Sequence, residues 1–236
     1  MSELDFSQYI NQHYLLPEEV SRTAENFIRS DISLLRLPNF LVSKFALSCS
    51  RFLSCDTTYT NTYGIFSKQP PTVNEATWLA STEEERFFFY QILNGTKSEA
   101  ISLNAMNFLK LRKLLRSEFF RSYIASLTEL NLVSTSAMLV HRMHKGHYLK
   151  RHNDRSHNRK LAFILYMSPD WLPECGGELK IVDNQGFETS VQPCYNSLVL
   201  FDVSKHQYHY VSEVLDSSEQ MPNHRNGRIS INGWFS

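Results

Sequence analysis

Two side chains that can bind a metal ion, His152 and Asp154, stand two residues apart in the run YLKRHND. On an extended segment, residues at this spacing point to the same face and lie about 6.5 Å apart along the strand. One imidazole and one carboxylate can therefore reach the same ion. The pair alone is weak evidence, because the chain has nine histidines and a surface hydrogen-bonded pair has the same spacing.

A third ligand has to come from later in the chain, and His209 in the run YHYVSEV is the residue we select. Two histidines and one carboxylate on one face of an octahedral site are the ligand set of non-haem iron(II) oxygenases, and they leave positions open for a co-substrate and oxygen. His206 competes with His209, because it lies three residues earlier in the same region. The sequence predicts an iron site at His152, Asp154 and His209.

Arg228 begins the apolar terminal run RISINGWF. A planar guanidinium offers a fork of donors that matches a carboxylate. Ser230, two residues on, points to the same face of a strand and can add a hydroxyl donor. The common alternative for an arginine is a surface ion pair, which contributes little to stability. An arginine at the start of an apolar strand favours the inward orientation, and with it a carboxylate site at Arg228 and Ser230.

The elements that must position these residues are short strands in the second half of the chain. From Leu132 onward, short segments rich in Val, Ile, Phe and Tyr alternate with turn residues such as Gly176-Gly177, a pattern typical of β-structure. The predicted strands are residues 136–143, 160–167, 178–182, 197–203, 208–214 and 228–235.

The first half of the chain has apolar residues at three- and four-residue steps, which predicts helices over residues 40–52, 83–93 and 105–127. Residues 57–66, rich in β-branched and aromatic side chains, predict a strand. No linker divides the halves, so we expect one domain over residues 1–236, with mainly helical support in 1–130 and a strand-rich core in 131–236. The predicted fold class is α+β: a double-stranded β-helix, or jelly roll, buttressed by N-terminal helices.

Five motifs in order carry a resemblance to a known family. The HxD pair is followed by FILYMSPDW, GGEL, HxVSEV and RISINGWF. This series resembles the prolyl-hydroxylase-related branch of the 2-oxoglutarate oxygenases over residues 132–235. Within that branch it is most similar to the ribosomal-protein prolyl 3-hydroxylases of the eukaryotic cytoplasm and their bacterial relatives, with HxVSEV and RISINGWF carrying most of this narrower likeness.

The resemblance implies a role for each site residue. It implies that Fe(II) is bound by His152, Asp154 and His209. It also implies that Arg228 pairs with the distal carboxylate of 2-oxoglutarate, and that Tyr166, in FILYM, donates its hydroxyl to the same carboxylate. A core position is the alternative for Tyr166, but its hydroxyl would then need a buried partner.

The resemblance also implies a reaction: hydroxylation of a C–H bond with Fe(II), 2-oxoglutarate and O2, releasing succinate and CO2. Asp154 predicts hydroxylation, because related halogenases lack this carboxylate. A prolyl residue in a protein is the expected substrate, and a free amino acid or another small metabolite is the alternative. A cupin-like metal-binding protein without oxygenase activity is the alternative of another class, but it has no need of Arg228.

Other residues near the motifs are candidates for substrate contact. Tyr148 and Asn153 are expected near the metal, and Trp234 is expected as a wall of the site or as a core residue. No role is predicted for His141, His144, His147 or His157. Seven basic residues against one acid in residues 142–160 suggest either a rim that attracts an anionic substrate or a solvated charged face.

Two features depart from the family pattern. Residues 216–226 form a polar insertion that is either a lid or a tolerated surface loop. The eukaryotic ribosomal enzymes carry a second, non-catalytic double-stranded β-helix, which we do not expect in this sequence. Their substrate therefore does not carry over directly.

Composition limits the class of partner. Lysines plus arginines equal aspartates plus glutamates at 24 each, so the basic excess that favours nucleic-acid binding is missing. The N-terminal run MSELDFSQYINQHYLLPEE lacks the basic and apolar regions of a signal peptide, and no stretch has membrane-spanning length. Four cysteines without a CxxC pair predict reduced thiols. We expect a cytoplasmic protein without nucleic-acid or membrane partners.

Overall fold

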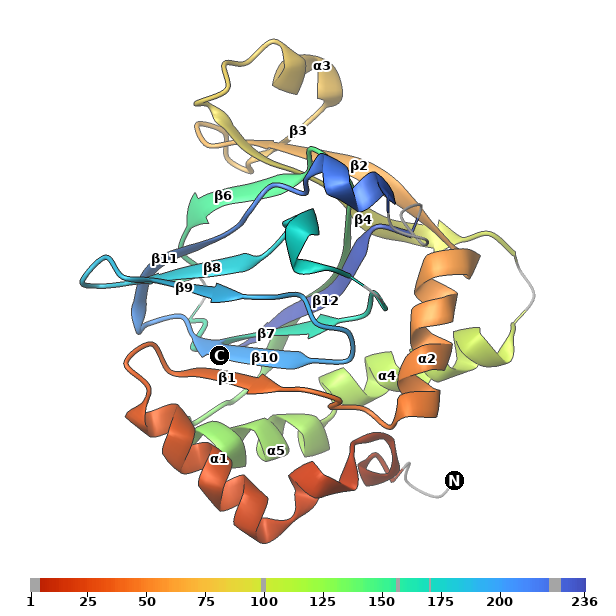
Figure 1. Cartoon of the computed structure of the whole chain (residues 1–236), viewed down its shortest axis with the longest axis vertical. Coiled ribbons are helices and arrows are strands. Elements are labelled where there is room, and N and C mark those ends of the chain that lie inside the picture. The colour runs from red at the N-terminus through yellow and green to blue at the C-terminus, as the bar shows by residue number, and fades with distance from the viewer. Residues whose placement is uncertain (1–4, 99–100, 156–157, 170, 221–225) are drawn as a thin grey trace.

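A computed structural model describes residues 5–98, 101–155, 158–169, 171–220 and 226–236 (Figure 1). Its α-helices are α1 (Pro17–Arg29), α2 (Ser43–Arg51), α3 (Glu75–Leu79), α4 (Leu103–Arg116) and α5 (Glu118–Thr128). Its strands are β1 (Leu34–Leu37), β2 (Thr57–Ile65), β3 (Thr72–Val73), β4 (Arg86–Thr96), β5 (Thr135–Met143), β6 (Tyr148–His152), β7 (Leu161–Tyr166), β8 (Leu179–Asp183), β9 (Glu188–Val191), β10 (Leu198–Asp202), β11 (His206–Val211) and β12 (Arg228–Phe235).

The described strands form one curled antiparallel sheet in the order β1-β10-β7-β12-β5-β4-β6-β11-β8-β9, with β2 and β3 beside β4. Strand β4 is the bend of this sheet. Its N-terminal part pairs with β6, where Phe88 lies opposite Leu149, and its C-terminal part pairs with β5, where Ile92 lies opposite His141. The sheet is thereby folded into two facing layers, one containing β7, β10 and β12 and the other containing β6, β8 and β11 (Figure 1).

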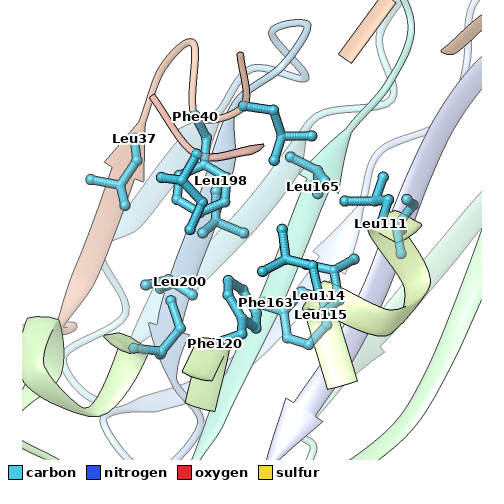
Figure 2. Close-up of a cluster of buried hydrophobic side chains, with 14 of the residues drawn as sticks. Leu37, Phe40, Leu111, Leu114, Leu115, Phe120, Phe163, Leu165, Leu198 and Leu200 are labelled. Atoms are coloured by element: carbon cyan, nitrogen blue, oxygen red, sulfur yellow. The ribbon is translucent and has the colours of Figure 1, made fainter. Parts of the chain in front are cut away.

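Strand β7 separates two hydrophobic clusters, because all six of its residues are buried. One set of alternate side chains, including Phe163 and Leu165, packs on the helical side against Leu111 and Phe120 (Figure 2). The other set, including Ile164, faces the opposite layer and joins residues of β8 and β10. Helices therefore cover one face of the sheet, and the space between the two layers contains the second cluster.

The helix predicted over residues 83–93 is wrong. This segment enters strand β4, which runs from Arg86 to Thr96. Phe87, Phe88, Phe89 and Tyr90 are all at least half-buried, because β4 is covered on both faces. A strand buried on both faces loses the apolar and polar alternation that distinguishes strands from helices, so periodicity could not decide between them.

The helix predicted over residues 105–127 is two helices, α4 and α5, separated at Ser117. The Ser117 hydroxyl donates to the Leu114 carbonyl oxygen at 2.7 Å and accepts from the Phe120 N–H at 3.1 Å. One side chain thus contacts the end of α4 and caps the start of α5. The apolar spacing continues across this break, because both helices pack on the same sheet face.

The remaining element predictions agree with the structure within a few residues. The helix over 40–52 corresponds to α2, the strand over 57–66 to β2, and the six strands of the second half to β5, β7, β8, β10, β11 and β12. Strands β1, β3 and β9 were not predicted, and β6 was expected only as the extended segment that carries His152. Residues before 130 therefore supply strands to the sheet in addition to helices. None of the described helices combines the length and apolar character needed to cross a bilayer.

Candidate metal and co-substrate site

A cavity of about 340 Å³ opens between the two layers of the sheet. Its lining includes residues from β4, β5, β6, β7, β8, β10, β11 and β12, so both halves of the chain contribute to it. Five of the six metal and co-substrate residues predicted from the sequence, His152, Asp154, His209, Arg228 and Ser230, line this one cavity. The sixth, Tyr166, packs directly against Arg228, whose guanidinium carbon is 4.9 Å from the centre of the tyrosine ring.

Strand pairing brings the two predicted histidine ligands together. His152 on β6 lies directly opposite His209 on β11, and their ring centroids are 4.2 Å apart. Asp154 follows β6 by two residues, with its oxygens 3.8 Å from His152 Nε2 and 3.3 Å from His209 Nε2. One ligand atom from each residue lies within 4.8 Å of the others. Two imidazole nitrogens and one carboxylate on one side of a cavity fit a divalent iron with open positions.

Protonation also suits metal binding. The pKa of His152 is lowered to about 4, mainly by burial. The neighbouring His209 also lowers this pKa, and its effect is larger than the increase that Asp154 causes. The Nδ1 of His152 lies 2.9 Å from the Lys150 carbonyl oxygen, so Nδ1–H donates to it and Nε2 keeps its lone pair for a metal. Burial raises the pKa of Asp154, but the hydrogen bond with His209 and the nearby imidazoles and indole outweigh it, so the net pKa is well below the usual range.

Trp234 and Arg159 hold the carboxylate of Asp154 in place. The indole Nε1–H of Trp234 donates to Asp154 Oδ2 at 2.7 Å, and Arg159 Nη1 lies 3.4 Å from Oδ1. The Arg159 guanidinium stacks on the indole ring at 4.0 Å from its centre. Trp234 therefore forms a wall of the cavity and orients a candidate metal ligand at the same time.

Trp234→Phe is expected to weaken Fe(II) or Mn(II) binding roughly 10- to 100-fold, the usual cost of losing a partner that orients a metal ligand. The phenyl ring keeps the wall and the contact with Arg159 but cannot donate to Asp154. Metal titration followed by calorimetry measures the change. Trp171→Phe is the matched control, because that indole donates to the Gly176 carbonyl oxygen instead. Equal metal affinity in Trp234→Phe and the wild type would mean that the hydrogen bond to Asp154 has no such role.

Arg228 is a buried cation without a carboxylate partner among the described residues. The residue is 2% exposed, its Nη1 contacts the Met143 sulfur at 3.3 Å, its guanidinium packs against Tyr166, and its Nε has no hydrogen-bond partner among the described residues. Burial lowers the pKa of Arg228. The Tyr166 hydroxyl beside it is fully buried and also lacks a partner within the described chain. Buried charges in proteins are paired, so this arrangement fits a bound carboxylate.

The GGEL motif makes room for Arg228. A side chain at Gly177 would place its Cβ 2.9 Å from Arg228 Cδ, and one at Gly176 would lie 2.3 Å from the Glu213 carbonyl oxygen. Both glycines have positive φ angles of 69°, a region that glycine adopts without steric cost. Gly177 therefore leaves room for the arginine stem, and Gly176 leaves room for the backbone at Glu213.

Ser230 lies between two polar residues of the neighbouring strands. Across the sheet it faces Tyr166 on β7 and His141 on β5. Its hydroxyl accepts from the Asn232 amide at 3.2 Å, which leaves its own hydrogen available for a ligand. Arg228, Ser230 and Tyr166 thus converge on one end of the cavity.

Of the residues predicted to contact substrate, Trp234 lines the cavity, whereas Tyr148 and Asn153 do not. Tyr148 packs instead against Tyr63 and Trp78. The reason is an irregularity in the pairing of β6 and β11, where three residue steps on one strand oppose two steps on the other. Simple alternation fails there, and Leu149 takes the inward position.

Phe87 and His141 are among the residues of the cavity wall that sequence reasoning missed. Phe87 packs edge-on against His152, with ring centroids 5.5 Å apart, and stacks on the exposed Phe66. No signal could reveal it once its strand had been read as a helix. His141 lies two residues before Met143, on the face of β5 that Arg228 and Ser230 oppose. Because His141 and Met143 are two residues apart on a predicted strand, their side chains point to the same face, and this spacing could have indicated that His141 faces the site.

The basic residues of the predicted rim have partners within the protein. Arg142 donates to the Gln91 side chain at 2.7 Å, Lys145 lies 3.3 Å from Asp216, and Lys160 donates to the Asn131 carbonyl oxygen at 2.6 Å. The structure therefore favours a charged surface held by internal contacts over a rim that attracts an anionic substrate.

Three sequence predictions fall on residues that the structure does not describe. The side chain of His206, the rival third ligand, lies outside the described residues, as does His157. The 216–226 insertion is described at Asp216–Gln220, a short 3₁₀ helix, and at Asn226, but not at residues 221–225. Whether this segment is a lid stays an untested prediction.

Comparison with known proteins gives three kinds of likeness. Residues 138–236 match the family model of the 2OG-Fe(II) oxygenase superfamily. A prolyl 3-hydroxylase, OGFOD1, of Mus musculus is 34% identical over 131 residues, which are 53% of this chain and 23% of the mouse protein. The prolyl 3-hydroxylase sudestada1 of Drosophila melanogaster is 34% identical over 161 residues, 62% of this chain and 27% of the fly protein. The matched stretch thus spans about a quarter of each relative.

Solved structures share the fold over most of the chain. A Trichoplax adhaerens prolyl hydroxylase, in complex with a peptide of the hypoxia inducible factor oxygen degradation domain, has a TM-score of 0.60 at 16% identity, covering 92% of this chain and 89% of that one. A Pseudomonas putida prolyl-4-hydroxylase has a TM-score of 0.57 at 16% identity, covering 92% and 97%. These neighbours confirm the predicted jelly roll with helical support.

Proposed function

We propose that this chain, whose residues 138–236 match the family model of the 2OG-Fe(II) oxygenase superfamily, is a dioxygenase that hydroxylates a prolyl residue in a protein. The observation that carries this proposal is the pairing of two features in one cavity. The cavity is lined by a cluster of two histidines and an aspartate and by a buried arginine without an anionic partner in the described chain.

We assign Fe(II) to His152, Asp154 and His209, and the distal carboxylate of 2-oxoglutarate to Arg228, Ser230 and Tyr166. When bound, Fe(II), 2-oxoglutarate and O2 supply the oxidising chemistry, with succinate and CO2 as the other products. The protein orients the groups that react and keeps water away from them. Trp234 and Phe87 serve this purpose, because they place apolar surface beside the metal ligands.

The prolyl substrate is supported by two observations. The relatives in mouse and fly are both described as prolyl 3-hydroxylases. Phe87 also gives the cavity an aromatic wall next to His152, and Phe66, which is not part of the cavity lining, stacks on Phe87 with ring centroids 4.5 Å apart. Phe66 is 44% exposed, so part of this aromatic surface is open to a partner. An apolar five-membered ring in a peptide suits such a surface better than a charged metabolite does.

The decisive experiment is anaerobic addition of Fe(II) and 2-oxoglutarate to the protein. We expect a visible metal-to-ligand charge-transfer band that forms only when both are present. A protein that binds Fe(II) but gives no band with 2-oxoglutarate would be a metal-binding jelly roll of another kind, and the dioxygenase proposal would fail.

The substrate class is tested separately by succinate release in air. Proline-containing protein extracts should stimulate release and gain one oxygen atom by mass spectrometry, whereas free amino acids should do neither. Stimulation by a free amino acid alone would favour the small-molecule alternative. The expected cytoplasmic location stays a prediction.

A further inference from the structure

His141 is a cavity residue to which the proposed function gives no role. Its imidazole lines the same cavity as Arg228 and Ser230. Its Nε2 atom is enclosed by protein and has no hydrogen-bond partner among the described residues. A buried ring nitrogen without a partner is costly, because it has lost its hydrogen bond to water. A ligand group bound in the cavity would supply the hydrogen-bond partner that this nitrogen lacks.

The position of His141 in the sheet directs it to the carboxylate end of the cavity. His141 on β5 lies directly opposite Ser230 on β12, and Ser230 lies opposite Tyr166 on β7. Side chains directly opposite one another in antiparallel strands have Cβ atoms about 5 Å apart. Tyr166, Ser230 and His141 thus form one row across three strands, and two members of the row already belong to the proposed carboxylate site.

The next pair along these strands is Arg228 and Met143, on the same face as Ser230 and His141. Arg228 Nη1 contacts the Met143 sulfur at 3.3 Å, which fixes the guanidinium beside the row. Its charge also helps to lower the pKa of His141. A carboxylate that pairs with Arg228 and Ser230 is therefore bounded by His141 on the β5 side.

The orientation of the His141 ring is set by its neighbours. It stacks on Tyr90 of β4, with ring centroids 4.3 Å apart and planes inclined by 22°. Burial, with Arg228 as the second cause, lowers the pKa of His141 to about 4. The imidazole is therefore neutral at neutral pH, carries one N–H, and can stand beside the arginine without charge repulsion.

We propose that His141 donates its Nε2–H to the distal carboxylate of 2-oxoglutarate and makes this cavity selective for dicarboxylic 2-oxo acids. This inference rests on the proposed function. A carboxylate offers about four acceptor positions, which Arg228, Ser230, Tyr166 and His141 together can occupy. A 2-oxo acid that ends in a methyl group would leave all of these donors without an acceptor, and buried donors left in this way discriminate strongly against such a ligand.

The test is calorimetric binding of two ligands to the Mn(II)-loaded protein without oxygen: 2-oxoglutarate, and 2-oxopentanoate, which has the same chain length but no distal carboxylate. His141→Phe keeps the stacking on Tyr90 and cannot donate. We expect its Kd for 2-oxoglutarate to rise roughly 10- to 150-fold, the contribution of a hydrogen bond to a charged group. Its Kd for 2-oxopentanoate should stay close to the wild-type value.

Two further variants separate donation from packing. His141→Gln places an amide N–H at a similar reach and should recover much of the affinity for 2-oxoglutarate. His144→Phe makes the same substitution three residues later, outside the lining of the cavity, and should leave both affinities unchanged. Thermal unfolding of each variant checks that it is folded.

An equal loss for both ligands in His141→Phe would assign the residue to packing and overturn the inference. Unchanged binding of 2-oxoglutarate would overturn it as well. In both cases the wild type still binds 2-oxoglutarate, so the proposed function stands. If the Mn(II)-loaded wild type does not bind 2-oxoglutarate at all, the proposed function fails, and this inference fails with it.

Discussion

Arg228→Met is expected to weaken 2-oxoglutarate binding roughly 100- to 5,000-fold, which corresponds to the 3–5 kcal/mol that breaking a buried ion pair costs. Methionine fills a similar volume but offers no donor to the distal carboxylate. Calorimetry with the Mn(II)-loaded protein measures the loss. Arg228→Lys is the matched control: it keeps the positive charge but loses the fork of donors, and should bind with intermediate affinity.

The same substitution should have the opposite effect on the ligand-free protein. Arg228 is 2% exposed and has no carboxylate partner in the described chain, so its burial costs free energy that no ion pair within the described residues recovers. We expect Arg228→Met to raise the free energy of unfolding by about 1–4 kcal/mol, as when buried ion pairs are replaced by well-packed apolar residues.

Adding Mn(II) and 2-oxoglutarate should then shift the difference in stability towards the wild type. Ligand at one hundred times its Kd stabilises the wild type by about 2.7 kcal/mol and leaves the variant unchanged. Urea unfolding with and without the two ligands measures both effects. A ligand-free variant that is less stable than the wild type would indicate that Arg228 has a structural partner and is not reserved for a ligand.

His209→Ala is expected to remove Fe(II)-dependent succinate release and to weaken metal binding by more than roughly 100-fold. It deletes one of three candidate ligands, a greater loss than the 10- to 100-fold cost of deleting a residue that only orients a ligand. His209 is 5% exposed and lies opposite His152, with 3.3 Å between its Nε2 and an Asp154 oxygen. Metal affinity is measured by calorimetry and succinate release by a coupled assay.

His206→Ala is the control for this prediction, because His206 starts the same strand, three residues earlier. It should bind metal as the wild type does. If His206→Ala loses the metal and His209→Ala keeps it, the ligand assignment has to be exchanged between the two histidines. If both lose it, β11 itself has been disturbed, which far-ultraviolet circular dichroism would reveal.

The fold could be predicted largely from residues 131–236, where each buried strand is short and lies between turn residues. The class of fold followed from this pattern, and the helices α2, α4 and α5 followed from their apolar spacing. Strand β4 could not be predicted, because its run of aromatic residues is covered on both faces. Whether such a run is helix or strand depends on the partners β5 and β6, which lie far away in the sequence.

The site residues that could be predicted are those whose side-chain type indicates their chemistry, such as metal ligands and an arginine that binds a carboxylate. His152, Asp154, His209 and Arg228 are recognised from spacing and motif order, and the cavity brings all four together. Residues that were expected in the site only because strand alternation points their side chains inward were predicted less well. Tyr148 was expected inside, but the irregular pairing of β6 with β11 gives the inward position to Leu149. No property of the isolated segment encodes that irregularity.

The bend made by β4 also limits how the molecule can be divided. The segment that matches the family model begins at residue 138, yet its β5 and β6 are joined within the sheet through Arg86–Thr96, which lies before it. Cut at that boundary, the segment would expose two unpaired strand edges and the sheet face that α4 and α5 cover. We infer that this segment cannot fold on another scaffold by itself: a graft has to carry a strand equivalent to β4.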